Sequence, residues 1–237
     1  MSGLVNALFP VVLIGGIAAL AIGLYVIGQR REQQRDLEYA AYAQAHNFQY
    51  LPARAGGQDA YARIVPFFHQ GYYRKWRHEV SGSTGGHQFA AFEYLYTVST
   101  GRSSYTYREA IIKWENADTN LPMFIVAPET FISRIGQSVF GAQDVDFPED
   151  PAFSSAYVLK GDPASVTALF TPAVRGYLTA NPGQHVAGAG HVLFWWRANQ
   201  ALPRAAYLDP FLSAGAEIGR LFLGWPASGG SGRWRSG

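Results

Sequence analysis

The first apolar segment of the chain is long and carries no charge. Residues 4–28 (LVNALFPVVLIGGIAALAIGLYVIG) contain no Asp, Glu, Lys or Arg. A helix rises about 1.5 Å per residue, so about 20 residues cross a hydrocarbon core of about 30 Å. A cleaved signal peptide would need a basic start, which Met1-Ser2-Gly3 lacks, and a buried core helix would need a polar face. The pattern therefore predicts a transmembrane anchor over residues 1–28.

The flanks of this segment predict its orientation. Arg30, Arg31 and Arg35 follow it closely, and no Lys or Arg precedes it. The positive-inside rule then places the N-terminus outside and residues 29–237 in the cytoplasm. We therefore predict a single-pass protein of the inner (cytoplasmic) membrane, with the bilayer as its partner through residues 4–28.

Small residues recur on one face of this predicted span. Gly15, Ala19 and Gly23 follow one another at intervals of four residues. Small side chains at this spacing let two spans approach closely, which favours a homodimer. Chance is the alternative, because Gly and Ala are common in spans.

The polar segment that follows is typical of a helix. Residues 29–46 contain no Gly or Pro, so we expect a helical stalk over 29–47. Residues 52–60 are typical of a loop. Strand-like runs then alternate with turns, and the turns at 81–86 and 99–103 predict an antiparallel meander. The predicted strands are 72–80, 87–98, 104–115, 122–127, 153–160, 184–189 and 191–197.

Helical signals appear in the second half of the chain. Pro at a first helical position and apolar residues at helical spacing predict helices over 129–135, 163–170, 172–180 and 205–223. Strands first and mixed helices and strands afterwards are typical of an α+β fold, an antiparallel sheet with helices packed on one face. We expect one cytoplasmic domain over 48–223 and a disordered Gly/Ser-rich tail over 224–237.

The composition narrows the function. The 237 residues include no cysteine, which excludes disulfides, thiolate metal sites and cysteine nucleophiles. A net charge of +2 does not indicate a nucleic-acid partner. Only 15% of the residues are charged, so the domain has either a large core or an apolar surface that awaits a partner. The sequence predicts no cofactor.

The densest charge lies in one loop. Asp144, Asp146, Glu149 and Asp150 fall within seven residues. Three interpretations stay open: a structural loop, a partner-binding edge, and a hard-cation site, for which the EF-hand spacing is missing.

Two further groups of residues carry candidate chemistry. The histidines at 78 and 87, and those at 185 and 191, could face each other across hairpins and assist an acid–base enzyme, although ordinary sheet histidines explain them as well. The run 72–78 (YYRKWRH) combines tyrosines with cations, which suits either a half-buried strand or an anionic lipid surface.

Several runs carry a resemblance. The segments FEYLYT (92–97), LPMFIVAPE (121–129) and GAQDVDFPEDPAFSSAYVLKGD (141–162) resemble uncharacterised bacterial membrane-anchored proteins with one N-terminal span and an α+β domain. The resemblance implies that architecture and carries over no catalytic residue. We therefore expect a non-catalytic domain that binds a protein or a membrane component. An enzyme of unrecognised class, a hydrolase using Asp/Glu and His, and a sensor of anionic lipid surfaces are the alternatives.

Overall fold

The computed structural model describes residues 2–54, 58–84, 86–135 and 143–224, with side chains from residue 16 onward except at 58, 59, 134 and 135. The chain divides into two compact units. Residues 1–38 hold most of the helix α1 (Ser2–Ala45), and residues 39–237 hold the sheet and every other element.

The predicted membrane span is wrong. Among the residues whose side chains are described, no helix combines the length and the apolar character that crossing a bilayer requires. Residues 4–28 lie within helix α1. The helix then runs on into the charged segment of Arg30, Arg31 and Arg35. The anchor over 1–28, the single-pass inner-membrane localisation and the predicted topology are therefore corrected.

The small-residue face of the predicted span loses its basis as well. Gly15 lies outside the residues whose side chains are described, Ala19 is exposed, and a Cβ at Gly23 would meet nothing within 4 Å. The homodimer contact through these residues stays a prediction, without the membrane span on which it was based.

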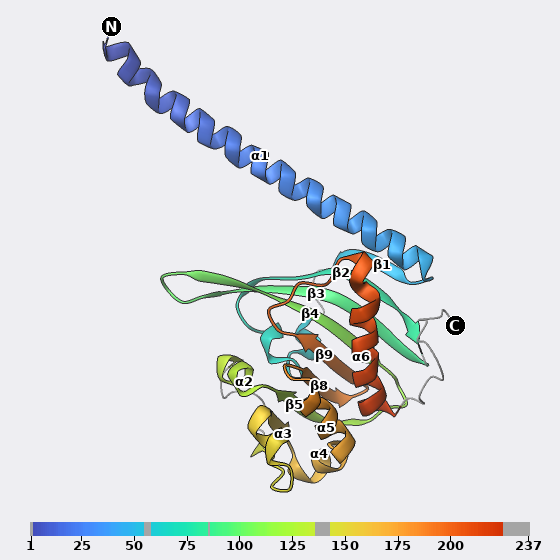
Figure 1. The fold of residues 1–237 in the computed structure, drawn as a ribbon. Helices are drawn as coiled ribbons and strands as arrows, with labels where there is room; N and C mark the ends of the chain where they lie inside the picture. The colour runs from blue at the N-terminus through green and yellow to red at the C-terminus, as the bar shows by residue number, and fades with distance from the viewer. Residues whose placement is uncertain (1, 55–57, 85, 136–142, 225–237) are drawn as a thin grey trace. The chain divides into compact units, whose positions relative to one another are not determined.

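The second unit is built on one nine-stranded antiparallel sheet (Figure 1). The strand order is β1-β2-β3-β4-β9-β8-β5-β7-β6, and every neighbouring pair is antiparallel. The predicted meander is confirmed, because β2, β3 and β4 pair in sequence order. The strands are β1 (Gln49–Arg54), β2 (Tyr72–Thr84), β3 (His87–Ser99), β4 (Ser104–Glu115), β5 (Leu121–Ala127), β6 (Gln143–Asp144), β7 (Val158–Gly161), β8 (His185–Gly190) and β9 (Val192–Arg197).

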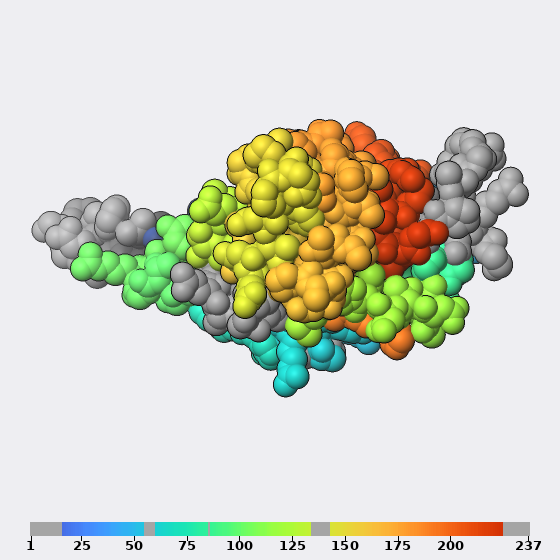
Figure 2. Space-filling view, turned by 90° about the horizontal axis from the view of Figure 1, so that it is seen from below, coloured from blue at the N-terminus to red at the C-terminus, as the bar shows by residue number. Residues whose placement is uncertain are grey.

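Both faces of the sheet are covered, which explains why strands such as β3 are buried almost continuously. One core lies under the helices between β6 and β8 and the C-terminal helix, and the other lies under the helix after β5 and the short 3₁₀ segments between β1 and β2. Helices therefore lie on both faces, not on one as the sequence suggested. The first face carries α3 (Pro151–Ala156), α4 (Pro163–Leu169), α5 (Pro172–Ala180) and α6 (Leu208–Leu223), while α2 spans Glu129–Ile135 (Figures 1 and 2).

Three helix starts repeat one local design. Asp150, Asp162 and Thr171 each cap a helix by accepting a backbone N–H three residues later, and Pro follows each of them. The predicted helices over 163–170 and 172–180 are therefore confirmed. The predicted strand over 153–160 is wrong in its first half, because the cap at Asp150 and Pro151 starts α3 there.

Two further boundaries differ from the sequence pattern. The predicted loop over 52–60 begins inside strand β1, which pairs with β2 from Gln49 to Arg54. At the other end α6 stops at Gly224, which adopts the left-handed conformation (φ 68°). The remaining tail, 225–237, lies outside the described residues.

The last turns of α1 belong to the sheet domain. Tyr39 is buried in the core, and its hydroxyl donates to the carbonyl oxygens of Leu202 (3.3 Å) and Pro203 (2.6 Å). Tyr42 hydrogen-bonds to Asp209 at the start of α6. These contacts fasten the segment before β1 to the segment before α6.

Candidate functional site

The acidic loop runs from β6 to α3 and is anchored to the domain by buried apolar side chains. Val145 and Phe147 are buried, whereas Asp144, Asp146 and Glu149 face solvent. The loop therefore alternates apolar anchors with carboxylates along an edge of the sheet, next to β7.

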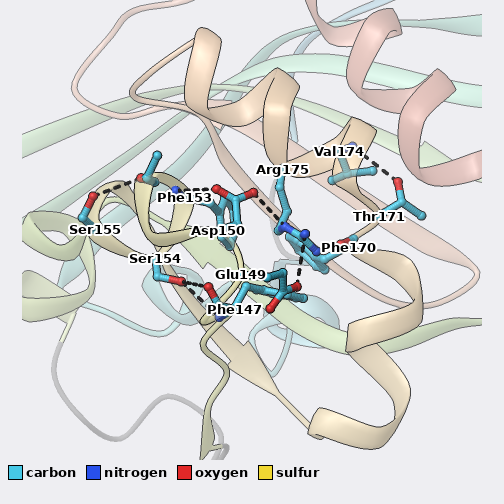
Figure 3. Close-up of polar contacts among 11 residues, drawn as sticks. Phe147, Glu149, Asp150, Phe153, Ser154, Ser155, Phe170, Thr171, Val174 and Arg175 are labelled. Carbon is cyan, nitrogen blue, oxygen red and sulfur yellow. Dashed lines mark hydrogen bonds and ion pairs between the residues drawn. The ribbon is translucent and has the colours of Figure 1, made fainter.

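Arg175 of α5 holds the end of this loop (Figure 3). Its buried guanidinium donates from Nε to Oδ2 of Asp150 at 2.9 Å and lies 3.2 Å from Oε1 of Glu149. A third nitrogen, Nη1, donates to the carbonyl oxygen of Phe170 at 2.8 Å, and the guanidinium lies over the ring of Phe147. One cation thus joins the loop to two helices.

Ion pairs of this kind neutralise three of the four carboxylates in the loop. The hydrogen bond from Arg175, together with the backbone N–H of Phe153, lowers the pKa of the Asp150 carboxyl below its ordinary value. Asp144 forms an ion pair with Lys160 of β7 at 2.5 Å. Among the described contacts, this leaves Asp146 as the carboxylate of the four without an ion pair. The geometry is that of a structural loop, and the partner-binding edge stays a prediction.

The histidines are not brought together in the predicted pairs. His87 lies opposite Thr84 in the register, not opposite His78, which occupies an irregularity of β2 with φ 52°. His185 lies opposite Trp196, while His191 sits in the turn and contacts the carbonyl oxygen of Thr119 at 2.6 Å. A pairing of two histidines needs directly opposed strand positions, and the observed register separates them.

Two buried glutamates form a feature that the sequence analysis missed. Glu93 and Glu109 are fully buried, one on each face of the sheet. Glu93 accepts the backbone N–H of Leu202 at 3.2 Å, and Glu109 accepts that of Asn199 at 3.0 Å. They hold the segment after β9 across the sheet. The available signal was a glutamate inside each of two strand-like runs, of which the first, 87–98, is otherwise mostly apolar and aromatic.

Beyond that segment, β3 and β4 project from the body as a ribbon (Figures 1 and 2). β4 pairs with β9 only from Ala110 onward, and β2 pairs with β1 only from Trp76 onward. The ribbon end therefore consists of the hairpin and the first residues of β2. We call its exposed tyrosines and cations the hairpin-end surface: Tyr72, Tyr73, Lys75, Arg102, Tyr105 and Arg108.

The tyrosine side chains of this surface are highly exposed to solvent for large aromatic residues. Tyr73 is 74% exposed, Tyr105 58% and Tyr72 42%. The rings of Tyr72 and Tyr73 lie 5.1 Å apart, and the hydroxyl of Tyr72 hydrogen-bonds to that of Ser104 at 3.0 Å. Most other large aromatic side chains of the sheet are buried, so these three are set apart by position and not by composition.

The backbone of residues 71–75 departs from regular strand geometry. Gly71 has φ 67° and lies so close to β3 that a Cβ would come within 2.2 Å of the carbonyl oxygen of Thr97. The register then shifts between Tyr72 and Lys75, and Tyr73 is left-handed with φ 50°. A non-glycine residue in this region costs about 1 kcal/mol or more. The irregularity leaves the Tyr73 side chain exposed, where burial does not offset that cost.

The charge of the ribbon end has one sign. Residues 69–78 and 97–108 contain no Asp or Glu. Lys75 and Arg108 both lie opposite Leu95, so they share one side of the ribbon. Burial lowers the pKa of the neighbouring Arg77, Glu93 opposes that shift, and the positive charge of Arg108 adds to it. The side chain of Glu93, opposite Arg77, is buried, and the exposed charged side chains of the ribbon end are cations.

Comparisons with known proteins bear on the fold. No protein-family model and no curated protein matches the chain. The crystal structure of the mycobacterial trehalose monomycolate transport factor A, TtfA, has a similar fold, with a TM-score of 0.57 at 10% sequence identity. The match covers 83% of this chain and 98% of that chain. At this identity the likeness establishes a shared fold alone. The resemblance to uncharacterised membrane-anchored proteins stays a prediction.

Proposed function

We propose that this chain is a non-catalytic binding domain and that its partner docks on the hairpin-end surface. The observation that carries the proposal is Tyr73, a large aromatic side chain that is 74% exposed on a strained backbone. Strain of this kind clusters at functional sites, because the surrounding structure must hold it in place.

The chemistry of the surface supports binding over catalysis. Tyrosine and arginine are enriched where proteins meet partners, since they combine apolar area with polar ends. Lys75, Arg102 and Arg108 add positive charge, which favours an acidic partner, either a protein or a membrane component.

The hydrolase alternative receives less support. It needs a carboxylate of the acidic loop beside a histidine, but Glu149 and Asp150 pair with Arg175, Asp144 pairs with Lys160, and Asp146 faces solvent. The fold adds an analogy: the structurally similar mycobacterial protein is named a transport factor.

Site-specific photocrosslinking tests the proposal. A photoreactive phenylalanine replaces Tyr73 or Tyr105 in the full chain in cells, and Tyr207, which is 69% exposed on another part of the domain, serves as the matched control. We expect light-dependent adducts at positions 73 and 105 and none at 207. Adducts at all three positions alike, or none at 73 and 105, would contradict a specific binding surface there.

A further inference from the structure

We infer that the hairpin-end surface docks on a lipid surface that carries anionic headgroups. The inference rests on the proposed function and names the class of partner. It describes peripheral contact by a strand ribbon.

The shape of the ribbon end suits a soft, flat partner. Residues 104–109 of β4 do not pair with β9, and this end of the ribbon projects from the body (Figures 1 and 2). Two open hollows lie on other parts of the domain, one lined by Asn47 and Gln88 and one by His185 and Arg197. A protein partner binds best to a complementary surface of some breadth, whereas a lipid surface adapts to a narrow projecting end.

The charge of the ribbon end matches such a partner. Arg102 lies at the hairpin tip, and Lys75 and Arg108 lie further along one side. Each cation that reaches an anionic headgroup layer raises partitioning by roughly fivefold. The long side chains of Lys and Arg can reach headgroups while the strand itself stays above them.

The tyrosines supply the second component of interfacial binding. Tyr72 of β2 lies opposite Thr97, which lies opposite Thr106 of β4, so these three side chains share one face of the ribbon. Tyr105 precedes Thr106 on β4 and therefore points to the other face. Tyrosine is favoured at the level of the headgroups, where its ring is shielded and its hydroxyl stays wet. Tyrosines on both sides of the ribbon fit entry of the tip end-on.

Addition of a partner strand is the less suitable mode. Among the described strands, β1 pairs with β2 only from Trp76 onward, and before that point the register shifts and Tyr73 is left-handed. An irregular edge does not offer the continuous row of backbone groups that strand addition requires. The side chains, not the backbone, are therefore the contact.

Vesicle flotation of the full chain tests the inference. The vesicles contain phosphatidylcholine alone or equal parts of phosphatidylcholine and phosphatidylglycerol. We expect a clear preference for the anionic vesicles, which salt weakens. The double variant Lys75→Glu/Arg108→Glu is expected to lower partitioning into anionic vesicles by roughly tenfold or more.

The matched control reverses two exposed arginines elsewhere. Arg63→Glu/Arg204→Glu changes the net charge by the same amount on residues outside the ribbon end. It is expected to retain most of the binding. Equal losses in the two double variants would show a response to net charge alone and would overturn the inference.

A second readout reports the contact itself. Because the chain contains no cysteine, a single cysteine can carry an environment-sensitive fluorophore. The label in Tyr105→Cys should shift to the blue on anionic vesicles, whereas the label in Tyr207→Cys should not. A shift at both positions, or at Tyr207→Cys alone, would contradict docking through the ribbon end.

The outcomes separate this inference from the proposed function. If the wild-type chain shows no preference for anionic vesicles while position 73 or 105 still crosslinks to a protein, the lipid partner is wrong and the binding surface stands. If neither binding nor crosslinking is seen, both proposals are wrong.

Discussion

The Nε–H of Arg175 donates to Oδ2 of Asp150 at 2.9 Å, and Oδ1 of the same carboxylate accepts the backbone N–H of Phe153. One carboxylate therefore caps α3 and neutralises a buried guanidinium on α5. Through these two hydrogen bonds, the end of the acidic loop connects α3 to α5.

Removal of this guanidinium should destabilise the domain. Arg175→Met deprives the Phe170 carbonyl of a donor and two carboxylates of their cation, and we expect a loss of about 1–3 kcal/mol in the free energy of unfolding. Arg220→Met is the matched control, because the Arg220–Glu217 pair is exposed and is expected to contribute about 0.5 kcal/mol or less. Urea titration of the full chain measures both, and equal effects would contradict a special role for Arg175.

The same connection should respond to acid. Because the pKa of Asp150 is held below its ordinary value of 3.8, its contribution is complete above that value and disappears as the pH falls through the folded-state pKa. Asp150→Asn should therefore lower the Tm at neutral pH, and this loss should shrink as the pH falls through the lowered folded-state pKa and the wild-type carboxyl becomes protonated. A loss of Tm that is constant with pH would assign the effect to packing.

His87 should respond at milder pH. Burial lowers its pKa below 6.5, although Asp118 opposes the shift, and Nδ2 of Asn116 donates to Nδ1 of the ring at 3.0 Å. The neutral ring thus stabilises the fold above pH 6.5, and this contribution is lost as the pH falls toward the lowered pKa. His87→Gln should reduce the fall in Tm between about pH 7.5 and pH 5. An unchanged fall would place the response on another group.

Two helical glycines should respond in opposite directions. A Cβ at Gly215 of α6 would lie 2.5 Å from Cδ1 of Ile112 and 3.0 Å from the ring of Trp195, whereas a Cβ at Gly176 of α5 would meet nothing within 4 Å. Gly215→Val should therefore lower the free energy of unfolding by about 1–3 kcal/mol, because α6 must move off the sheet. Gly176→Ala should raise it by about 0.5–1 kcal/mol. Denaturant titration of the two variants tests this contrast.

Tyr73 should separate stability from binding. Asparagine tolerates the left-handed backbone better than tyrosine, so Tyr73→Asn should leave the Tm unchanged or raise it. The same variant should bind anionic vesicles more weakly than the wild-type chain. A clear fall in Tm would indicate that the Tyr73 ring stabilises the fold and would weaken its assignment to a partner.

Local signals were sufficient for much of the secondary structure. Asp162-Pro163 and Thr171-Pro172 carry their own caps, so α4 and α5 could be predicted without knowledge of the fold. The turns around residues 85 and 101 likewise predicted the meander of β2, β3 and β4. Where two local signals competed, as at Asp150 and Pro151 against an alternating pattern, the helix start prevailed and the predicted strand was wrong.

Candidate chemistry was harder to predict, because it depends on partners far along the chain. The four carboxylates of the acidic loop could be identified, but nothing near them in sequence indicates Arg175 or Lys160. Glu93 and Glu109 were missed because their partners are backbone N–H groups of residues 199–202. The exposed ends of Tyr73 and Arg108 follow from which strands stop short, which a strand pattern does not reveal.

The chain on its own therefore specified the α+β class, the order of most strands and helices, and the positions of its turns and caps, since these depend on residues within a few positions of one another. Pairing of β4 with β9, coverage of both sheet faces and projection of the hairpin end were decided by tertiary structure. Burial and charge pairing are properties of neighbours in space. Whether a tyrosine or a glutamate packs in the core, links two elements or stays exposed therefore depends on the neighbours that the fold places beside it.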